Sequence, residues 1–188
     1  MFTFVRRLAQ KELALSCLVI MTAILSSSVA YASPFGQGLF GADVPFGSGT
    51  SLSINLGGNV ALTLAPSGGN YSGTGSHIVT VTSTDVVGYM LYAHTTGSTN
   101  MTSSSSTIPA SSNSTANPLA VGSWGYNTTG SPSNFLGMAA TNSLLKDASG
   151  PYKSGDPTTV TYGALVSKTQ DAGSYSVAVT YTAVAKNQ

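Results

Sequence analysis

The sequence predicts an all-β protein, an antiparallel Ig-like β-sandwich of about seven to nine strands with one long Ser/Thr/Asn-rich loop. Short runs of alternating apolar and polar residues recur along the chain, and Gly- and Pro-containing turn signals separate them. No apolar period of 3.6 residues is sustained, so helices are not expected. Regularly spaced short strands joined by turns are typical of a sandwich of two packed sheets.

The first 32 residues of the 188-residue chain have the features of a secretory signal peptide. Three cationic residues lie between positions 6 and 11, an uncharged and mostly apolar stretch covers 13–25, and residues 30–32 (AYA) form an A-x-A cleavage site. The apolar stretch is shorter than the roughly 20 residues of a membrane-spanning helix. We therefore expect cleavage near Ala32–Ser33, a secreted or cell-surface location, and no membrane span in the mature protein.

Charge and cysteine usage narrow the class of protein. The only cysteine, Cys17, lies inside the predicted signal peptide, so disulfides and cysteine-based metal sites are not expected in the mature chain. After residue 32 the sequence holds four lysines and five aspartates, a net charge of 4 − 5 = −1, with no Arg and no Glu. These few charges are spread thinly and form no basic run, so no nucleic-acid partner is expected.

Six runs carry the period-two pattern of β-strands: Ser51–Leu56, Asn59–Ala65, Ser76–Thr82, Val86–His94, Thr158–Lys168 and Ser174–Ala185. The Gly57-Gly58 pair between the first two runs predicts a two-residue β-hairpin. The run Val86–His94 is apolar on both faces, which predicts a central strand buried on both sides. Only residues 135–146 are compatible with a short helix.

Two segments differ from the strand pattern. In residues 33–50, glycines alternate with Phe, Leu and Val, and two prolines argue against a helix. We expect this arm to be extended, and to pair either with its own domain or with another molecule. Residues 95–118 are mostly Ser, Thr and Asn and predict a long surface loop. The expected organisation is a signal peptide (1–32), an N-terminal arm (33–50) and a β-sandwich domain (51–188).

No constellation of catalytic residues stands out. The sequence has no G-x-S-x-G motif, no cysteine nucleophile after the signal peptide and no glycine-rich phosphate loop. The spacing of His77 and His94 matches no metal signature, and both are expected to be ordinary polar residues. We expect neither enzymatic activity nor a cofactor or metal.

Aromatic residues offer a second kind of site. Trp124 and Tyr126, separated by Gly125, could stack on a sugar ring, as could Tyr92. The competing interpretation, which the residue types favour, places Trp124 in the core, because a single Trp in a β-sandwich usually packs between the sheets.

Several short motifs resemble small secreted β-sandwich surface proteins of reduced-genome bacteria: Ile108-Pro109, Trp124-Gly125-Tyr126, Val160–Gly163, Asp171–Tyr175 and Val179–Ala183. Parts of the pattern are also similar to WxL-type bacterial surface domains, although Gly88–Leu91 and Tyr181–Ala183 stand where Trp-x-Leu would be. Spore-coat-U proteins and chaperone–usher pilins end on a similar A-G-x-Y strand, although this chain lacks their cysteines. The Asp171–Tyr175 stretch also matches the tyrosine-corner pattern of Ig domains.

The resemblance implies a non-catalytic secreted cell-surface structural or adhesion protein, in its strongest form a self-assembling pilin-like fibre subunit. In pilins the Ig-like fold is one strand short, and an N-terminal extension of the next subunit completes it. The partner would then be a second copy of the chain, by strand exchange or as a homo-oligomer. The expected strand contacts are Leu39, Phe40, Val44 and Phe46 of the arm with Tyr175, Val177, Val179 and Tyr181.

The alternative is a carbohydrate- or peptidoglycan-binding WxL-like module. Its partner would be cell-wall glycan, and its glycan contacts would be Tyr92, Trp124 and Tyr126.

Overall fold

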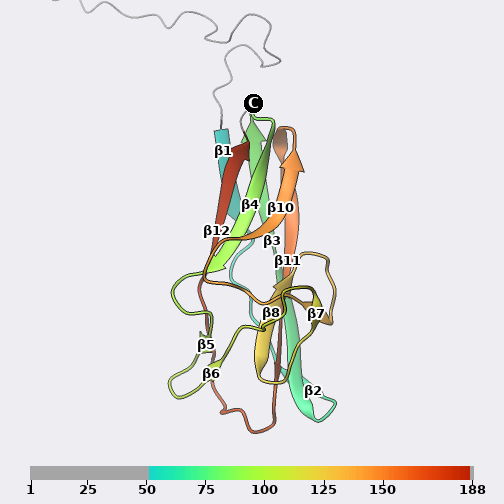
Figure 1. Ribbon diagram of the computed structural model, residues 1–188, viewed down its shortest axis with the longest axis vertical. Coiled ribbons are helices and arrows are strands. Elements are labelled where there is room, and N and C mark those ends of the chain that lie inside the picture. Colours follow the sequence, from blue (N-terminus) through green and yellow to red (C-terminus); the bar gives the residue numbers. More distant parts are fainter. Residues whose placement is uncertain (1–50, 187–188) are drawn as a thin grey trace, which may run out of the picture. The chain divides into compact units, whose positions relative to one another are not determined.

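The computed structural model describes residues 51–186, all of which belong to one compact unit (Figure 1). The predicted signal peptide and arm lie outside the described residues. The described part of the chain forms twelve strands: β1 (Ser51–Leu56), β2 (Ala65–Ser67), β3 (Asn70–Thr84), β4 (Gly88–Thr95), β5 (Met101–Thr102), β6 (Thr107–Ile108), β7 (Asn117–Pro118), β8 (Ser123–Asn127), β9 (Asn134–Phe135), β10 (Ser143–Ser149), β11 (Tyr152–Val166) and β12 (Val179–Lys186). Within residues 51–186 there is no helix, and hence none long and apolar enough to cross a membrane.

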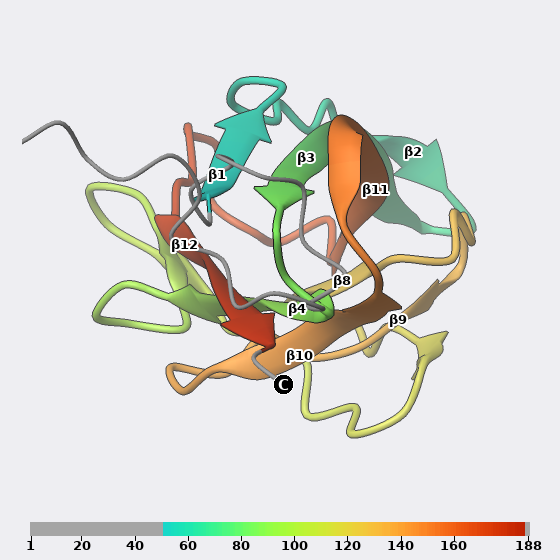
Figure 2. The ribbon, with the colours of Figure 1, turned by 90° about the horizontal axis from the view of Figure 1, so that it is seen from above.

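Two antiparallel sheets form the layers of a β-sandwich, which confirms the predicted all-β class. One sheet has the strand order β1-β3-β11-β8, with β2 paired to the first residues of β3. The other has the order β10-β4-β12. Seen from above, the β1, β3 and β11 ribbons lie on one side and β12, β4 and β10 on the other (Figure 2). Strand pieces of only two or three residues raise the count above the predicted seven to nine.

The core lies between the inner faces of these sheets. Val79 and Val81 of β3, Leu91 of β4 and Val160 of β11 are fully buried, and Trp124 of β8 packs among them. Fully burying a Val or Leu side chain contributes roughly 1.5–3 kcal/mol relative to leaving it exposed. Because side chains alternate between faces, a one-residue slip would turn this whole set outward, so the core also fixes the strand register.

The predicted Gly57-Gly58 hairpin does not form. The β1 strand pairs with β3 instead, and the Gly57 amide donates to the Ile78 carbonyl at 2.9 Å. Residues 59–64 then leave the sheet and pass over the inner face of β3. Glycines of β3 make this crossing possible, because a Cβ on Gly73 would lie 2.4 Å from the Thr63 carbonyl oxygen, and one on Gly75 would lie 2.8 Å from that of Ala61. The tertiary contact thus overrides the local turn signal.

The β4 strand is central in its sheet, as predicted, but it is not buried on both sides. Its inner residues Tyr89, Leu91 and Ala93 are fully buried. Its outer residues Met90 and Tyr92 are only partly buried. On this outer face of β4, only the neighbouring strands of the same sheet shield the side chains, and no third layer of described residues covers them.

The Ser/Thr/Asn-rich stretch 95–118 is more structured than a surface loop. It contains β5, β6 and the residues of β7, and it places Met101 and Ile108 in the core. The side-chain amide of Asn113 lies within hydrogen-bond distance of three carbonyl oxygens, those of Asn117, Pro118 and Phe135. Residues 135–146 form parts of β9 and β10, so the short helix considered there is absent.

The outer face of the larger sheet carries a glycine recess. Gly163 of β11 and Gly125 of β8 are direct cross-strand partners. The Phe135 ring fills the recess and is only 3% exposed, and a Cβ on Gly163 would lie 2.4 Å from a ring atom. Phe135 therefore covers the sheet on the side facing away from the core.

Candidate functional site

A large apolar groove opens at the side of the sandwich where β1 and β12 are the edge strands. Its volume is about 870 Å³. Residues 58–64 form one wall and residues 173–179 form the other. The floor includes the core residues Met101, Ile108 and Ala164. These three side chains remain buried but line the bottom of the groove.

The first wall is an extended segment outside both sheets. Its side chains alternate, with Val60, Leu62 and Leu64 partly buried and Ala61 and Thr63 exposed. Among the described residues, no backbone hydrogen bond joins Asn59–Leu64 to another part of the chain. This wall therefore has the side-chain pattern of a strand without the pairing of one.

The second wall is paired along only one edge. Ser176 exchanges two backbone hydrogen bonds with Thr102, at 2.9 and 3.0 Å, and the Ala178 carbonyl accepts from the Thr96 amide at 2.9 Å. Successive residues of an extended chain direct their backbone groups to opposite sides. The amides and carbonyls of Tyr175 and Val177 consequently face the groove, and no described backbone group pairs with them.

A tyrosine anchors the start of the second wall. The Tyr175 hydroxyl donates to the Asp171 carbonyl at 2.7 Å and accepts from Nε2 of Gln170 at 2.8 Å. A bond from a tyrosine hydroxyl back to the preceding backbone is also a feature of the tyrosine corner. The bond from Tyr175 to Asp171 holds the turn from which the wall runs toward β12.

A hydrogen-bonded chain of side chains closes the β1 end of the groove. His77 Nδ1 lies 2.9 Å from the Gly58 carbonyl oxygen, and His77 Nε2 lies 2.7 Å from the Tyr181 hydroxyl. The Tyr181 and Tyr162 hydroxyl oxygens are 2.5 Å apart. A carbonyl can only accept, so in neutral His77 the Nδ1 atom donates and Nε2 accepts from Tyr181, which leaves Tyr162 to donate to Tyr181. We call these three residues the His77–Tyr181–Tyr162 chain.

This chain connects both walls to the floor. Gly58 belongs to the first wall, Tyr181 continues from the second wall into β12, and Tyr162 lies on the floor. Burial raises the pKa of both the Tyr181 and the Tyr162 hydroxyl above the ordinary value of 10.0. Both tyrosines are therefore neutral hydrogen-bonding groups at physiological pH.

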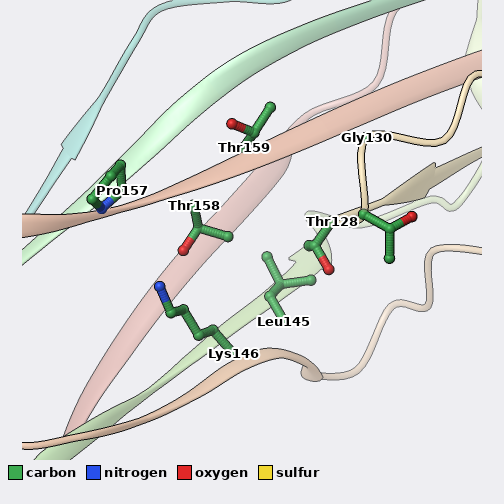
Figure 3. Close-up of a pocket in the computed structure, with 8 residues that line it drawn as sticks. Thr128, Gly130, Leu145, Lys146, Pro157, Thr158 and Thr159 are labelled. Atoms are coloured by element: carbon green, nitrogen blue, oxygen red, sulfur yellow. The ribbon is translucent and has the colours of Figure 1, made fainter.

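A smaller hollow on the opposite open side of the sandwich is polar (Figure 3). Its volume is about 530 Å³, and it lies between β10, β11 and the turn after β8. Lys146 Nζ on its rim is paired with Asp156 Oδ1 at 2.7 Å, and Asp156 Oδ2 accepts from the Tyr89 hydroxyl at 2.7 Å. The one lysine of this hollow is thus already engaged within the fold.

The sequence-predicted strand-contact residues divide into two groups. Tyr175, Val177, Val179 and Tyr181 all line the groove. The arm residues Leu39, Phe40, Val44 and Phe46 lie outside the described residues. The sequence reasoning missed the first wall, which it assigned to a hairpin strand, and it missed the role of His77. The glycines at 73 and 75 were the available signal, because they permit a chain to pass closely over β3.

The predicted glycan-contact aromatics do not lie together. Trp124 and Tyr126 are 0% and 4% exposed, and Trp124 Nε1 donates to the Thr99 carbonyl at 2.9 Å. These two residues belong to the core, as the competing interpretation of Trp124 predicted. Tyr92 lies on the outer face of β4, where its hydroxyl donates to Met90 Sδ at 3.1 Å.

Residues 51–186 contain no group of three His, Cys, Asp or Glu side chains that could hold a metal ion. The fold thus carries one large apolar groove bordered by two extended segments. Comparison of the whole chain with protein-family models, with curated proteins and with solved structures finds no match.

Proposed function

We propose that this chain is a non-catalytic, exported cell-surface structural or adhesion protein that assembles with copies of itself by strand addition. The observation that carries the proposal is the apolar groove, bordered by two extended segments whose groove-facing backbone pairs with no other backbone group of residues 51–186. An added strand would supply main-chain hydrogen bonds to the walls and side chains to the floor, which is the general basis of β-strand addition.

The contrast between the two open sides of the sandwich supports this proposal. Unpaired sheet edges attract other chains, and proteins protect them with charges and bulges. The β10 edge has both, since a bulge interrupts its pairing between Leu144 and Lys146, and Lys146 pairs with Asp156. The groove between the walls carries no charged residue. The side of the sandwich that carries the groove is therefore the one suited to receiving another chain.

The chain itself contains a suitable donor. Residues 33–50 precede β1 directly and combine Gly with Phe, Leu and Val, a composition compatible with an extended strand. A subunit with both a groove and an arm can join others head to tail, which leads to open-ended assemblies.

Negative-stain images and sedimentation velocity of the secreted protein test the proposal. We expect assemblies larger than one chain, and we expect deletion of residues 33–48 to yield single chains. A matched control is Leu144→Ser on the protected β10 edge, which is 53% exposed and should leave assembly unchanged. A secreted protein that sediments as one chain with and without residues 33–48 would contradict assembly.

A second candidate function is binding of carbohydrate or peptidoglycan, and one observation favours it. Tyr92 stands between Leu144 and Thr182 in the register of the smaller sheet, with Val184 nearby, so an aromatic ring and exposed apolar groups share one outer face. Co-sedimentation with purified peptidoglycan, weakened by Tyr92→Ala, would support this function. Equal retention of the native and Tyr92→Ala proteins would count against it.

A further inference from the structure

One part of the arm matches the groove in both length and pattern. From Phe40 to Phe46 the sequence FGADVPF places Phe40, Ala42, Val44 and Phe46 on one face of a strand, with Gly41, Asp43 and Pro45 on the other. This run has seven residues, as does the second wall, residues 173–179. No other seven-residue stretch between 33 and 50 has four apolar residues in strict alternation ending on large side chains.

We propose that the groove binds residues 40–46 of a second copy of the protein, an inference that rests on the proposed function. The His77–Tyr181–Tyr162 chain closes one end of the groove and limits how far this strand enters, and we call it the stop. The reach of the arm supports the identity of the bound strand, and the closure of the groove supports the stop.

The reach of the chain excludes residues 40–46 of the same copy. Phe46 is five residues before Ser51, a distance of at most roughly 18 Å when fully extended. The groove begins near Leu56, and β1 carries the chain from Ser51 to that level over about 16 Å. The arm would also have to reverse direction, which takes at least about two residues. Phe46 of the same chain therefore falls short of the groove, whereas Phe46 of another copy has no such restriction.

The stop is built from contacts that join the walls. His77 bonds to Gly58 of the first wall and to Tyr181 at the end of the second, so its ring bridges the groove. Beyond it, Leu52 and Ile54 of β1 and Ala183 of β12 pack against the core, and the sandwich is closed. An inserted strand longer than the walls would have to displace this bridge.

The stop is also aromatic. The His77 ring centroid is 5.4 Å from that of Tyr181 and 6.0 Å from that of Tyr162. Aromatic rings favour contacts with other rings at such spacings. Since residues 40–46 both begin and end with Phe, a phenyl ring reaches these three rings whichever way the strand is inserted.

Synthetic peptides added to the full secreted chain test the occupant. A peptide of residues 38–48 should convert assemblies to single chains by filling the groove, as measured by sedimentation velocity. It should also alter the fluorescence of Trp124, the only Trp, whose ring centroid is 6.3 Å from that of the groove residue Tyr162. The Val44→Ser peptide should compete at least about tenfold more weakly, because one apolar side chain is lost. The matched Asp43→Ser peptide should compete as well as the native one, since Asp43 lies on the other face.

Longer peptides test the stop. A peptide with Ala-Val inserted after Val44 continues the alternation for two more residues. On the native protein it should compete for the groove no better than the peptide of native length. With His77→Ala the longer peptide should compete better than the native-length one, whereas His94→Ala, outside the groove, should keep the native limit. Near-ultraviolet circular dichroism verifies that both variants are folded. If competition depended on peptide length in the folded His77→Ala protein as it does in the native protein, the role of the His77–Tyr181–Tyr162 chain as the stop would be overturned.

The outcomes separate this inference from the proposed function. If the protein assembles and a peptide of residues 33–39 competes while that of residues 38–48 does not, the occupant is wrong and assembly by strand addition stands. If the protein does not assemble and neither peptide binds, both the inference and the proposed function fail.

Discussion

Gly73 of β3 lies directly beneath the Thr63 carbonyl, and a Cβ on Gly73 would stand only 2.4 Å from that oxygen. The first wall of the groove is therefore positioned by the absence of a side chain on the strand below it. Thr63 has no backbone partner among the described residues, so contact with β3 is what holds the wall in place.

We predict that Gly73→Ala destabilises the protein by about 1–3 kcal/mol, the usual cost of forcing a group into a packed site. Denaturant unfolding measures the loss. The control is Gly173→Ala on the opposite wall, where the nearest atom is 3.6 Å away and the backbone does not need glycine, so a change below about 0.5 kcal/mol is expected. Equal stability of Gly73→Ala and the native protein would show that the first wall moves without cost.

The core position of Trp124 makes a second prediction. Trp124→Ala should lower the free energy of unfolding by about 3–5 kcal/mol, because it removes a fully buried aromatic side chain. Trp124→Phe should cost less, since it keeps a ring and loses only part of the buried volume together with the bond to Thr99. Val121→Ala, at a 52% exposed position close by, is the control and should cost little. A folded Trp124→Ala protein of native stability would remove Trp124 from the core.

A third prediction concerns alkaline pH. Burial raises the pKa of Tyr181 and Tyr162 above 10.0, so the folded protein holds these protons more tightly than the unfolded chain does. Stability from this source is complete below about pH 10 and falls as the pH rises beyond it. Tm measured from about pH 8 to pH 11.5 should therefore drop at the alkaline end, and less steeply in Tyr181→Phe.

The fourth prediction concerns the Ser/Thr/Asn-rich stretch. Asn113→Ala should cost about 1 kcal/mol, since it removes the donor to the part-buried Phe135 carbonyl and to two exposed carbonyls. Asn113→Asp should cost more, because a carboxylate has no N–H groups to offer and would face these oxygens with like charge. Asn55→Ala, on the exposed face of β1, is the control. Limited proteolysis provides a second readout, with cleavage between 95 and 118 accelerated only in the Asn113 variants.

Local patterns predicted the all-β class and the bounds of β1, where the alternation of Ser51–Leu56 coincides with the strand. They failed where the decisive contact is distant in sequence. The Gly57-Gly58 turn signal is strong by itself, but it competes with the crossing over Gly73 and Gly75. Similarly, the predicted run Thr158–Lys168 begins too late, because the structure extends β11 back to Tyr152 across a register shift in its pairing with β3.

The candidate site was half predictable for the same reason. The run from Tyr175 to Tyr181 has its own alternation and its own turn, and these residues do line the groove. The opposite wall and His77 acquire their roles only from the way β3 packs. A histidine within a polar strand carries no local sign that its ring will bridge Gly58 and Tyr181.

The position of the Phe135 ring over Gly163 and Gly125 affects the packing of another sheet on the outer face of the larger sheet. The β3 strand is 15 residues long and has no Asp, Glu, Lys or Arg, and long uncharged strands rich in Thr and Val are prone to dry face-to-face stacking of the kind found in amyloid. A ring fixed on the outer face keeps a second sheet from lying flush against it. The buried Phe135 ring thus discourages stacking of another sheet on this outer face.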